Sequence, residues 1–411
     1  MDIFIHVPSD RLRLLYLSYA FPPGVSGRFP SLNAAGHAAE TCMIQAFARK
    51  ANISSIGMMA REVFGKLEPR DDSLGLEHDL LLWDRRPELW HRWSSLMKLR
   101  HFYQSKTVSE GMPDIVLVKN LGPVYNFFVR WLRRQSPRPM IVLLLADASR
   151  LGQRLSLSKR FRSTFKPMVT LDEEKAIRWF DACVSFSPVT RSYFEPRGVP
   201  WMWMPSAFNF RYDPPLVAAN QSGPIRFGYF GTLGGHSNVI PMVQAFLQSK
   251  VSGSLHVCGH GGAGEILKKL SAQHLNFHFD GLLPRQSDCL AWSQKVDVLI
   301  NPRLPILGLE NSFPSKIFEY AMTGKAILST RTGGVDEVLG EEAFYLGTDK
   351  FEEVLCQRIR EVSTTQRGEL ARRGLALRHR VLNNYNWDEQ ARRMLEFFEG
   401  IIKLRGRQSI C

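Results

Sequence analysis

The residues of this chain best suited to hold and act on a ligand are Ser315, Lys316 and Glu319. Glu319 follows the other two by four and three positions, so on a helix all three share one side. Free backbone N–H groups at a helix start attract an anion, and Lys316 adds a mobile charge suited to phosphate. Glu319, one turn deeper, is placed to accept hydrogen bonds from ribose hydroxyls. The spacing therefore predicts part of a nucleotide-sugar site.

The surrounding sequence predicts a helix that leads into a buried strand. Pro314 suits the first turn of a helix and Gly324 suits the position just past its end, so we expect a helix over 314–323. The apolar run 326–330 is typical of a parallel strand buried on both faces. From spacing alone, a capped amphipathic helix that enters a sheet explains the same pattern equally well.

Three further loops follow predicted strands in the same half of the chain. Residues 228–235 and 258–264 are rich in glycine, which lets backbone N–H groups approach a phosphate, although tight turns need glycine anyway. Residues 301–303 form the third loop. Because the carboxyl ends of parallel strands meet at one edge of a sheet, we expect these loops and the helix at 314–323 to converge.

Apolar strand-like runs alternate with helical stretches along the chain. This alternation predicts an α/β protein with parallel sheets covered on both faces. The expected strands are 13–18, 114–118, 140–145 and 182–186 in the first half, and 225–230, 254–258, 277–280, 296–300, 326–330 and 343–346 in the second. A chain of 411 residues has room for two such domains, and the proline-rich region 205–224 is the expected linker.

Composition argues against a membrane-spanning, secreted or metal-binding class. Apolar runs such as 140–146 fall short of the roughly 20 residues that a transmembrane helix needs. The N-terminus lacks the basic start and long apolar centre of a signal peptide, so we expect a cytoplasmic protein. The six cysteines have neither Cys-x-x-Cys nor zinc spacing, which favours reduced thiols.

The net charge of +14 is concentrated in the first half of the chain. Residues 85–106 and 150–166 mix basic with bulky apolar side chains, which suits the surface of an anionic membrane. Nucleic acid is a competing partner for such segments. A solvated helix face whose aromatic side chains point into the core is an equally good interpretation of either segment.

Taken together, the motifs at 228–233, 255–261, 297–303 and 313–325 resemble those of retaining GT-B glycosyltransferases of the group 1 / family 4 type. Bacterial enzymes of capsule, O-antigen or exopolysaccharide assembly are the most similar in pattern. The resemblance implies two doubly wound Rossmann-like domains facing across a cleft. It places an acceptor-binding domain at 1–205, a nucleotide-sugar-binding domain at 206–385, and a C-terminal helix at 386–411 that crosses back to the first domain.

The resemblance also implies a role for individual residues. Ser315 and Lys316 hold the donor diphosphate, Glu319 contacts its ribose, and Gly231 and Thr232 lie against the diphosphate. The remaining donor-side residues are Gly259, His260 and Gly261, which border the base, together with Arg303 and Phe313. Gly24, in the loop after the first strand, is expected on the acceptor side.

The sequence departs from the family pattern at three places. The family often has two glutamates separated by seven residues, but Asn311 stands where the first is expected, and Glu310 is one position off. The turn that contains Thr232 lacks the usual arginine and lysine, so Lys316 and Arg303 would have to neutralise the leaving diphosphate. The family's His-Asp pair is replaced by Ala146-Asp147, which makes Asp147 the candidate at the reaction centre, on the acceptor side.

The expected reaction transfers a sugar from a nucleoside diphosphate sugar to a glycan or lipid-linked glycan. No Asp-x-Asp sequence occurs, so neither a metal nor another cofactor is expected. The expected site residues with a catalytic role are Asp147, Lys316 and Glu319. Two alternatives remain open: a UDP-sugar 2-epimerase with the same fold, and a non-catalytic scaffold that binds a membrane or nucleic acid. Peripheral contact with the inner face of the plasma membrane is expected, and nucleic-acid binding is not.

Overall fold

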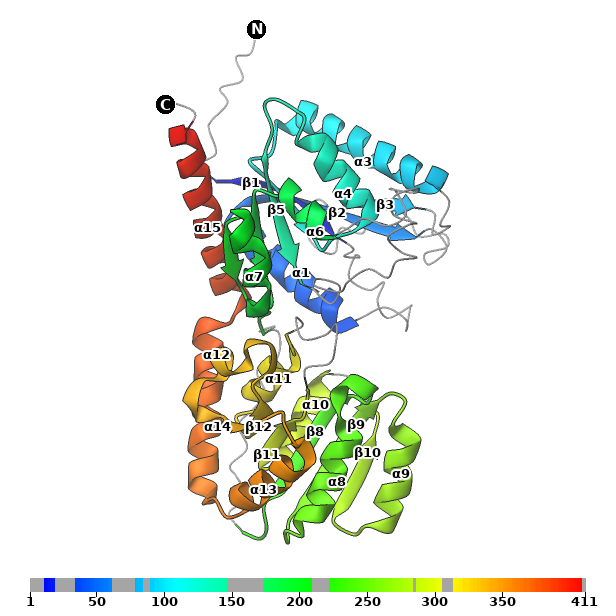
Figure 1. Ribbon diagram of the computed structural model, residues 1–411, viewed down its shortest axis with the longest axis vertical. Helices are drawn as coiled ribbons and strands as arrows, with labels where there is room; N and C mark the ends of the chain where they lie inside the picture. The colour runs from blue at the N-terminus through cyan, green and yellow to red at the C-terminus, as the bar shows by residue number, and fades with distance from the viewer. Residues whose placement is uncertain are drawn as a thin grey trace. The chain divides into compact units, whose positions relative to one another are not determined.

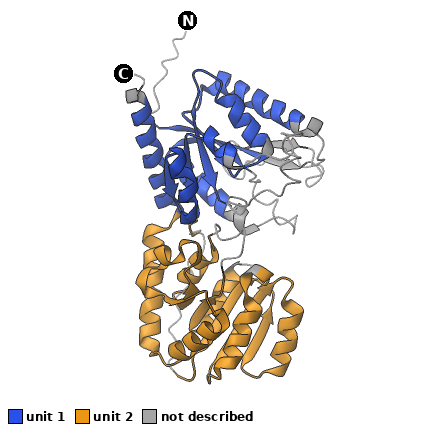
Figure 2. Ribbon diagram, viewed as in Figure 1, with its two compact units in different colours: residues 1–204, 387–411 blue, residues 205–386 orange. Residues whose placement is uncertain are grey.

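The computed structural model describes residues 11–18, 34–60, 78–83, 89–146, 173–208, 222–283, 286–304 and 313–408. The chain divides into two compact units (Figure 2). Unit 1 consists of Met1–Met204 with Trp387–Cys411, and unit 2 consists of Pro205–Asn386.

Unit 1 is built on a parallel sheet that has seven strands in the described residues, in the order β3-β2-β1-β4-β5-β6-β7. Its strands are β1 (Arg13–Ser18), β2 (Asn52–Ala60), β3 (His78–Trp83), β4 (Ile115–Lys119), β5 (Met140–Leu145), β6 (Ala182–Ser185) and β7 (Trp201–Trp203). Its helices are α1 (Ala34–Ala48), α3 (Leu89–Glu110), α4 (Pro123–Leu132), α6 (Glu173–Ala176), α7 (Arg191–Phe194) and α15 (Trp387–Gln408). Helix α3 packs on α4, and α1 packs on α15 (Figure 1).

Helix α15 contacts the rest of unit 1 through charged side chains at two places. Arg49, just after α1, donates to Asp388 at 2.8 Å. At the other end of α15, Arg405 contacts Asp181, a carboxylate that also accepts two hydrogen bonds from Arg138, at 2.6 and 3.1 Å. Burial raises the pKa of Asp181, but the hydrogen bonds from Arg138 and Arg405 outweigh it and leave the pKa below its ordinary value.

Unit 2 is built on a parallel sheet of six strands, counted over the described residues, in the order β10-β9-β8-β11-β12-β13. These are β8 (Arg226–Thr232), β9 (Ser254–His260), β10 (Phe277–Gly281), β11 (Val298–Asn301), β12 (Ala326–Thr330) and β13 (Phe344–Leu346). The helices are α8 (Val239–Ser249), α9 (Gly264–Gln273), α10 (Gln286–Trp292), α11 (Lys316–Met322), α12 (Val335–Leu339), α13 (Phe351–Ser363) and α14 (Arg367–Asn384). Helix α8 packs on α13, and α11 packs on α14.

The sequence identified ten of the strands, and its predictions were most accurate where the strand is buried. β5 and β12 have the predicted bounds, and every residue of both is buried. β2, β3 and β7 were not predicted. β2 starts Asn52-Ile-Ser-Ser, where polar residues interrupt the apolar run, and β7 has only three residues, none of them fully buried.

Helix α11 begins at Lys316, two residues after the predicted start at Pro314. The backbone N–H groups of Ile317 and Phe318 donate to the carbonyls of Pro314 and Ser315, at 3.0 and 3.2 Å, so the chain already turns there with a tighter i→i+3 pattern. The helix ends at Met322, one residue before the predicted end, and Gly324 has a left-handed φ of +69° just past the capping residue Thr323. Arg378 of α14 then donates to the carbonyl of Met322 at 3.0 Å, which satisfies a buried carbonyl at the helix end.

Candidate functional site

The candidate site lies where the strand order of the second sheet reverses. β9 and β10 lie on one side of β8, and β11, β12 and β13 lie on the other. Ligands of open parallel sheets bind outside the carboxyl ends of the strands at such a point. Gly231 and Thr232 end β8 and Arg303 follows β11, so the structure places these three predicted residues there.

Gly231 and Gly259 lie where the turns after β8 and β9 pack against each other. Their φ angles, +143° and +151°, lie in a region that side-chain-bearing residues rarely adopt. A Cβ atom on Gly259 would stand only 1.8 Å from the carbonyl oxygen of Gly231. Gly261, with φ +145°, would place a Cβ 2.7 Å from the carbonyl carbon of Leu233. Close approach of two backbones therefore requires Gly259 and Gly261 whether or not a phosphate binds.

Thr232 and His260 are register partners at the ends of β8 and β9, and both are exposed. The backbone N–H of Leu233 donates to the carbonyl of His260 at 2.8 Å, which joins the two turns. Asn238 joins the first turn to the loop after β11, because its side-chain N–H donates to the carbonyl of Pro302 at 3.3 Å. The three loops thus share one edge of the sheet.

Lys316 reaches from the start of α11 across the end of β8. Its Nζ donates to the Tyr229 hydroxyl at 2.7 Å and lies 4.4 Å from the centroid of that ring. A Cβ on Gly231 would be 2.7 Å from the same Nζ, so glycine also makes room for the ammonium group. No carboxylate pairs with Lys316 in the part of the chain that the structure describes. Its charge is therefore available to an anion.

The other predicted residues of the 313–319 segment differ in exposure. Phe313 is buried and its ring lies 5.4 Å from that of Phe318, so it anchors the helix start. Ser315 is exposed and Glu319 is half-buried. A hydrogen bond with Cys258 lowers the pKa of the Cys289 thiol, and burial and the charge of Glu319 oppose this lowering.

Hydrogen bonds fix the backbone of Arg303. Its carbonyl accepts hydrogen bonds from the hydroxyls of Thr330 and Thr332, the second at 3.3 Å, so β12 fixes the loop after β11. Asn301, one residue before this loop, is buried and donates to the Ser329 hydroxyl at 2.9 Å. The side chain of Arg303 is half-buried at the same edge as Gly231.

The predicted residues Gly24 and Asp147 lie outside the described residues, as do Glu310 and Asn311. Their proposed roles stay predictions. The segment 150–166 lies outside the described residues as well, and so does the start of the segment 85–106.

Two tyrosines that the sequence did not single out connect β8 with α11. The Tyr320 hydroxyl donates to the carbonyl of Phe230 at 3.0 Å and accepts from its N–H at 3.3 Å. Tyr229 receives the hydrogen bond from Lys316. Both tyrosines are fully buried. From the sequence alone they cannot be distinguished from ordinary aromatic core residues.

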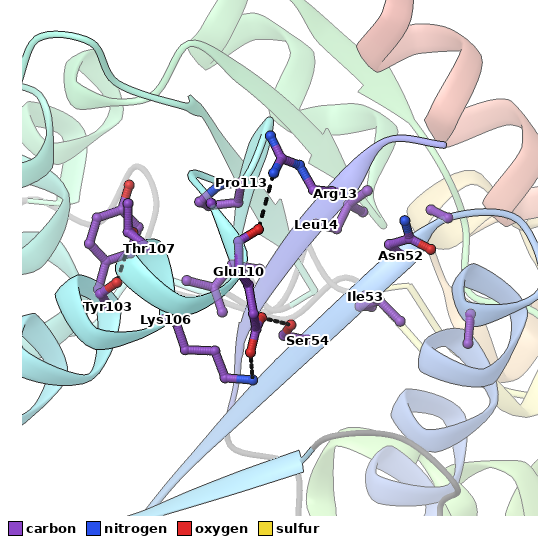
Figure 3. Close-up of a pocket in the computed structure, with 14 residues that line it drawn as sticks. Arg13, Leu14, Asn52, Ile53, Ser54, Tyr103, Lys106, Thr107, Glu110 and Pro113 are labelled. Carbon is purple, nitrogen blue, oxygen red and sulfur yellow. Dashed lines mark hydrogen bonds and ion pairs between the residues drawn. The ribbon is translucent and has the colours of Figure 1, made fainter. Parts of the chain in front are cut away.

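A cavity of about 430 Å³ lies in unit 1, and none of the residues that line it is a predicted site residue. It opens at the amino ends of β1 and β2, next to Arg13 and Asn52, whereas ligands of such sheets bind at the carboxyl ends (Figure 3). Its charges are already paired: Lys106 contacts Glu110 at 2.8 Å, and Arg13 donates to the Glu110 carbonyl at 3.2 Å. The cavity is therefore a weaker candidate for an anion than the surroundings of Lys316.

Over the described residues, no three His, Cys, Asp or Glu side chains are grouped so that they could hold a metal ion. Searched over the same residues, no helix is long and apolar enough to cross a membrane.

Comparison with known proteins supports a glycosyltransferase of the GT-B fold. Residues 224–364 match the family described as "Glycosyl transferases group 1". They include Gly231, Gly259, Arg303 and Lys316, so the match covers the candidate site. A search of curated proteins found no match.

Solved structures match nearly the whole chain. A glycosyltransferase from Rickettsia africae ESF-5 is 15% identical with a TM-score of 0.66, covering 96% of this chain and 100% of its own. The lipopolysaccharide outer core galactosyltransferase WaaB matches at 13% identity and a TM-score of 0.62, with coverages of 96% and 100%. Anabaena HepE, solved in complex with UDP, matches at 13% and 0.62, with coverages of 95% and 100%. These similarities confirm the predicted α/β, GT-B fold class.

Proposed function

We propose that the protein is a retaining glycosyltransferase that moves a sugar from a nucleoside diphosphate sugar to a glycan or lipid-linked glycan in cell-surface polysaccharide biosynthesis. One observation carries the proposal. The ammonium group of Lys316, which has no carboxylate partner among the described residues, lies over Gly231 at the switch point of the sheet. This position is inside the segment that matches group 1 glycosyltransferases.

The proposed chemistry depends on stabilising a diphosphate leaving group. Breaking the anomeric C–O bond gives the sugar oxocarbenium character and leaves negative charge on the diphosphate. Fixed cations and N–H groups aimed at that charge lower the barrier most. In the proposal Lys316 and Arg303 supply the cations, and Ser315 with the backbone of Gly231 and Thr232 supplies hydrogen bonds. Because α11 has only seven residues, we assign the main attraction to Lys316 rather than to the helix dipole.

The remaining residues would position the donor and the acceptor. Glu319 is proposed to bind the ribose hydroxyls, and the turn at 259–261 is proposed to border the base. Asp147 and Gly24 are proposed for the acceptor side in unit 1. The proposal includes no metal and no further cofactor.

We also propose that unit 1 contacts an anionic membrane surface from the cytoplasmic side. Helix α3 supports this through Trp93 and Met97, which are 51% and 45% exposed and are followed by exposed Lys98. Two other aromatic side chains of α3 face inward, since Tyr103 is buried and Phe102 packs on the core. Trp93→Ser with Lys98→Glu should reduce sedimentation with phosphatidylglycerol vesicles and leave the melting temperature unchanged. Equal sedimentation of variant and wild type would argue against this surface.

A thermal-shift screen against UDP-, GDP- and dTDP-sugars tests the donor site. A ligand at 100 times its Kd stabilises the folded state by about 2.7 kcal/mol, or roughly 5–10 °C for a unit of this size. Lys316→Ala and Glu319→Ala should each reduce the shift. Lys268→Ala, which removes an exposed lysine from α9, is the matched control and should not. No shift with any donor, or shifts that both substitutions leave unchanged, would refute the site.

Product analysis separates the proposal from its two alternatives. A glycosyltransferase slowly releases nucleoside diphosphate from its donor when water replaces the acceptor. A 2-epimerase would convert a UDP-sugar into its epimer without an acceptor. A non-catalytic scaffold would do neither, and a nucleic-acid scaffold would bind with an affinity that falls steeply with salt.

A further inference from the structure

The hydrogen bonds around Tyr229 have one consistent direction. The Lys316 ammonium can only donate, so the Tyr229 oxygen must accept at 2.7 Å. The tyrosine proton is then directed to the carbonyl of Thr232, also at 2.7 Å. Lys316 uses one of its three protons in this way. Over the residues that the structure describes, the other two have no acceptor, so they remain for a ligand at the Gly231–Thr232 turn.

This contact fixes a side chain that is otherwise highly mobile. Lysine has four rotatable bonds and a strongly hydrated ammonium group, so an unattached Lys316 would sample many positions in solvent. The Tyr229 ring is fully buried beneath it and cannot follow such movement. The ring face also attracts the ammonium, whose nitrogen lies 4.4 Å from the centroid.

We propose that Tyr229 is a positioning residue that holds the Lys316 ammonium over Gly231, ready for the diphosphate of the donor. The inference rests on the proposed function, since it assigns to Tyr229 the preparation of that donor site. Preorganised charge costs no rearrangement when the leaving group forms. Loss of the hydroxyl should therefore weaken diphosphate binding and slow the release of nucleoside diphosphate.

Tyr229→Phe removes this function with little other damage. The ring and its packing remain. The Thr232 carbonyl keeps a partner, because the Ser237 hydroxyl also donates to it, at 2.5 Å. A buried acceptor is thus not left unsatisfied, which is the usual cost of deleting one hydrogen-bonding group.

Tyr320→Phe is the matched control. It also removes a buried hydroxyl that contacts β8, but within the described part of the chain that hydroxyl bonds to the backbone of Phe230 and not to Lys316. It should lower the melting temperature without changing the preference for diphosphate over nucleoside.

The experiment is calorimetric titration of wild type and both variants with UDP, GDP and dTDP and with the corresponding nucleosides. Hydrogen bonds to charged groups are among the stronger ones, so Tyr229→Phe should weaken binding of the preferred diphosphate about tenfold. Nucleoside binding should be unchanged. In Lys316→Met, adding Tyr229→Phe should cause no further loss, because the two residues act as one unit. In Tyr229→Phe, the rate at which nucleoside diphosphate is released from the donor should fall by a similar factor.

Four results would overturn the inference: unchanged diphosphate binding in Tyr229→Phe, equal losses for nucleoside and diphosphate, additive losses in the double variant, or a Tyr229→Phe protein that does not fold. A wild-type protein that binds none of the three diphosphates would overturn the proposed function together with the inference. Wild-type binding with an unaffected Tyr229→Phe variant would overturn the inference alone.

Discussion

Replacing Gly259 with alanine should damage both the stability of unit 2 and its donor site. The added Cβ would stand 1.8 Å from the carbonyl oxygen of Gly231, which is backbone and cannot rotate away. The φ of +151° is itself unfavourable for alanine. Strain of this kind costs about 1–3 kcal/mol, and overpacking adds about 1–3 kcal/mol. The total is about 2–6 kcal/mol.

That cost can be measured as a melting temperature. For a unit of this length, 1 kcal/mol corresponds to about 2–4 °C, so the transition of unit 2 should fall by about 4–24 °C. Nucleoside diphosphate binding should weaken in parallel, because the turns after β8 and β9 move apart. Gly262→Ala is the matched control in the same loop. Nothing lies within 4 Å of its Cβ position, so the change should stay within about 0.5 kcal/mol.

The reasoning would be refuted by a Gly259→Ala protein that melts within about 2 °C of wild type and binds the same diphosphate equally well. That result would mean that the two turns do not approach as closely as the φ angles and the backbone contact indicate. Equal damage from Gly262→Ala would also count against it, because the effect would then belong to the loop as a whole.

Three further predictions address single residues. Gly231→Ala should displace the Lys316 ammonium, because the added Cβ would stand 2.7 Å from its nitrogen. Calorimetry should then show diphosphate binding weakened about tenfold and nucleoside binding unchanged. Glu319→Gln should have the opposite selectivity: nucleoside binding should weaken about tenfold, while pyrophosphate should bind as before. An equal loss of pyrophosphate binding would contradict the proposal that Glu319 binds the ribose. Asp181→Asn should destabilise unit 1 by about 3 kcal/mol at pH 7, because it breaks the buried contacts with Arg138 and Arg405. The pKa of Asp181 is lowered in the folded state, so its contribution is present above its unfolded pKa of about 3.9 and is lost as the pH falls through the folded value. The difference between the melting temperatures of variant and wild type should therefore narrow below about pH 4, and a constant difference down to pH 2 would contradict it.

The sequence predicted the parts of the fold whose signal is local. β5 was identified because Met140–Leu145 is a continuous apolar run, as a strand buried on both faces requires. A left-handed glycine follows α11 at 324, as expected. β2 was missed because its buried polar residue, Ser55, breaks the pattern that identifies a core strand.

The site was predicted in its residue types but not in its contacts. The glycines at 231 and 259 were expected in order to admit a phosphate, whereas in the structure Gly259 lets the two turns pack together and Gly231 makes room for the Lys316 ammonium. Tyr229 looked like an ordinary core residue. Its contact with Lys316 joins positions 87 apart, so it depends on the tertiary fold and leaves no local signal.

The environment of the segment 85–106 also depends on the tertiary fold and could not be predicted from the sequence. The sequence left a membrane surface and a solvated helix face equally open, and the described part of α3 divides its aromatic side chains between the two environments. Tyr103 is buried, whereas Trp93 is 51% exposed. The orientation in which α3 packs decides which of its aromatic side chains are exposed. Composition alone does not give that orientation.

A crystal structure of the protein with the nucleoside diphosphate that stabilises it most would test the central claim directly. The account predicts that the diphosphate lies against the backbone of Gly231 and Thr232, within hydrogen-bond distance of the Lys316 ammonium. A diphosphate bound elsewhere, for example in the unit 1 cavity beside Arg13, with Lys316 left without a ligand, would contradict it.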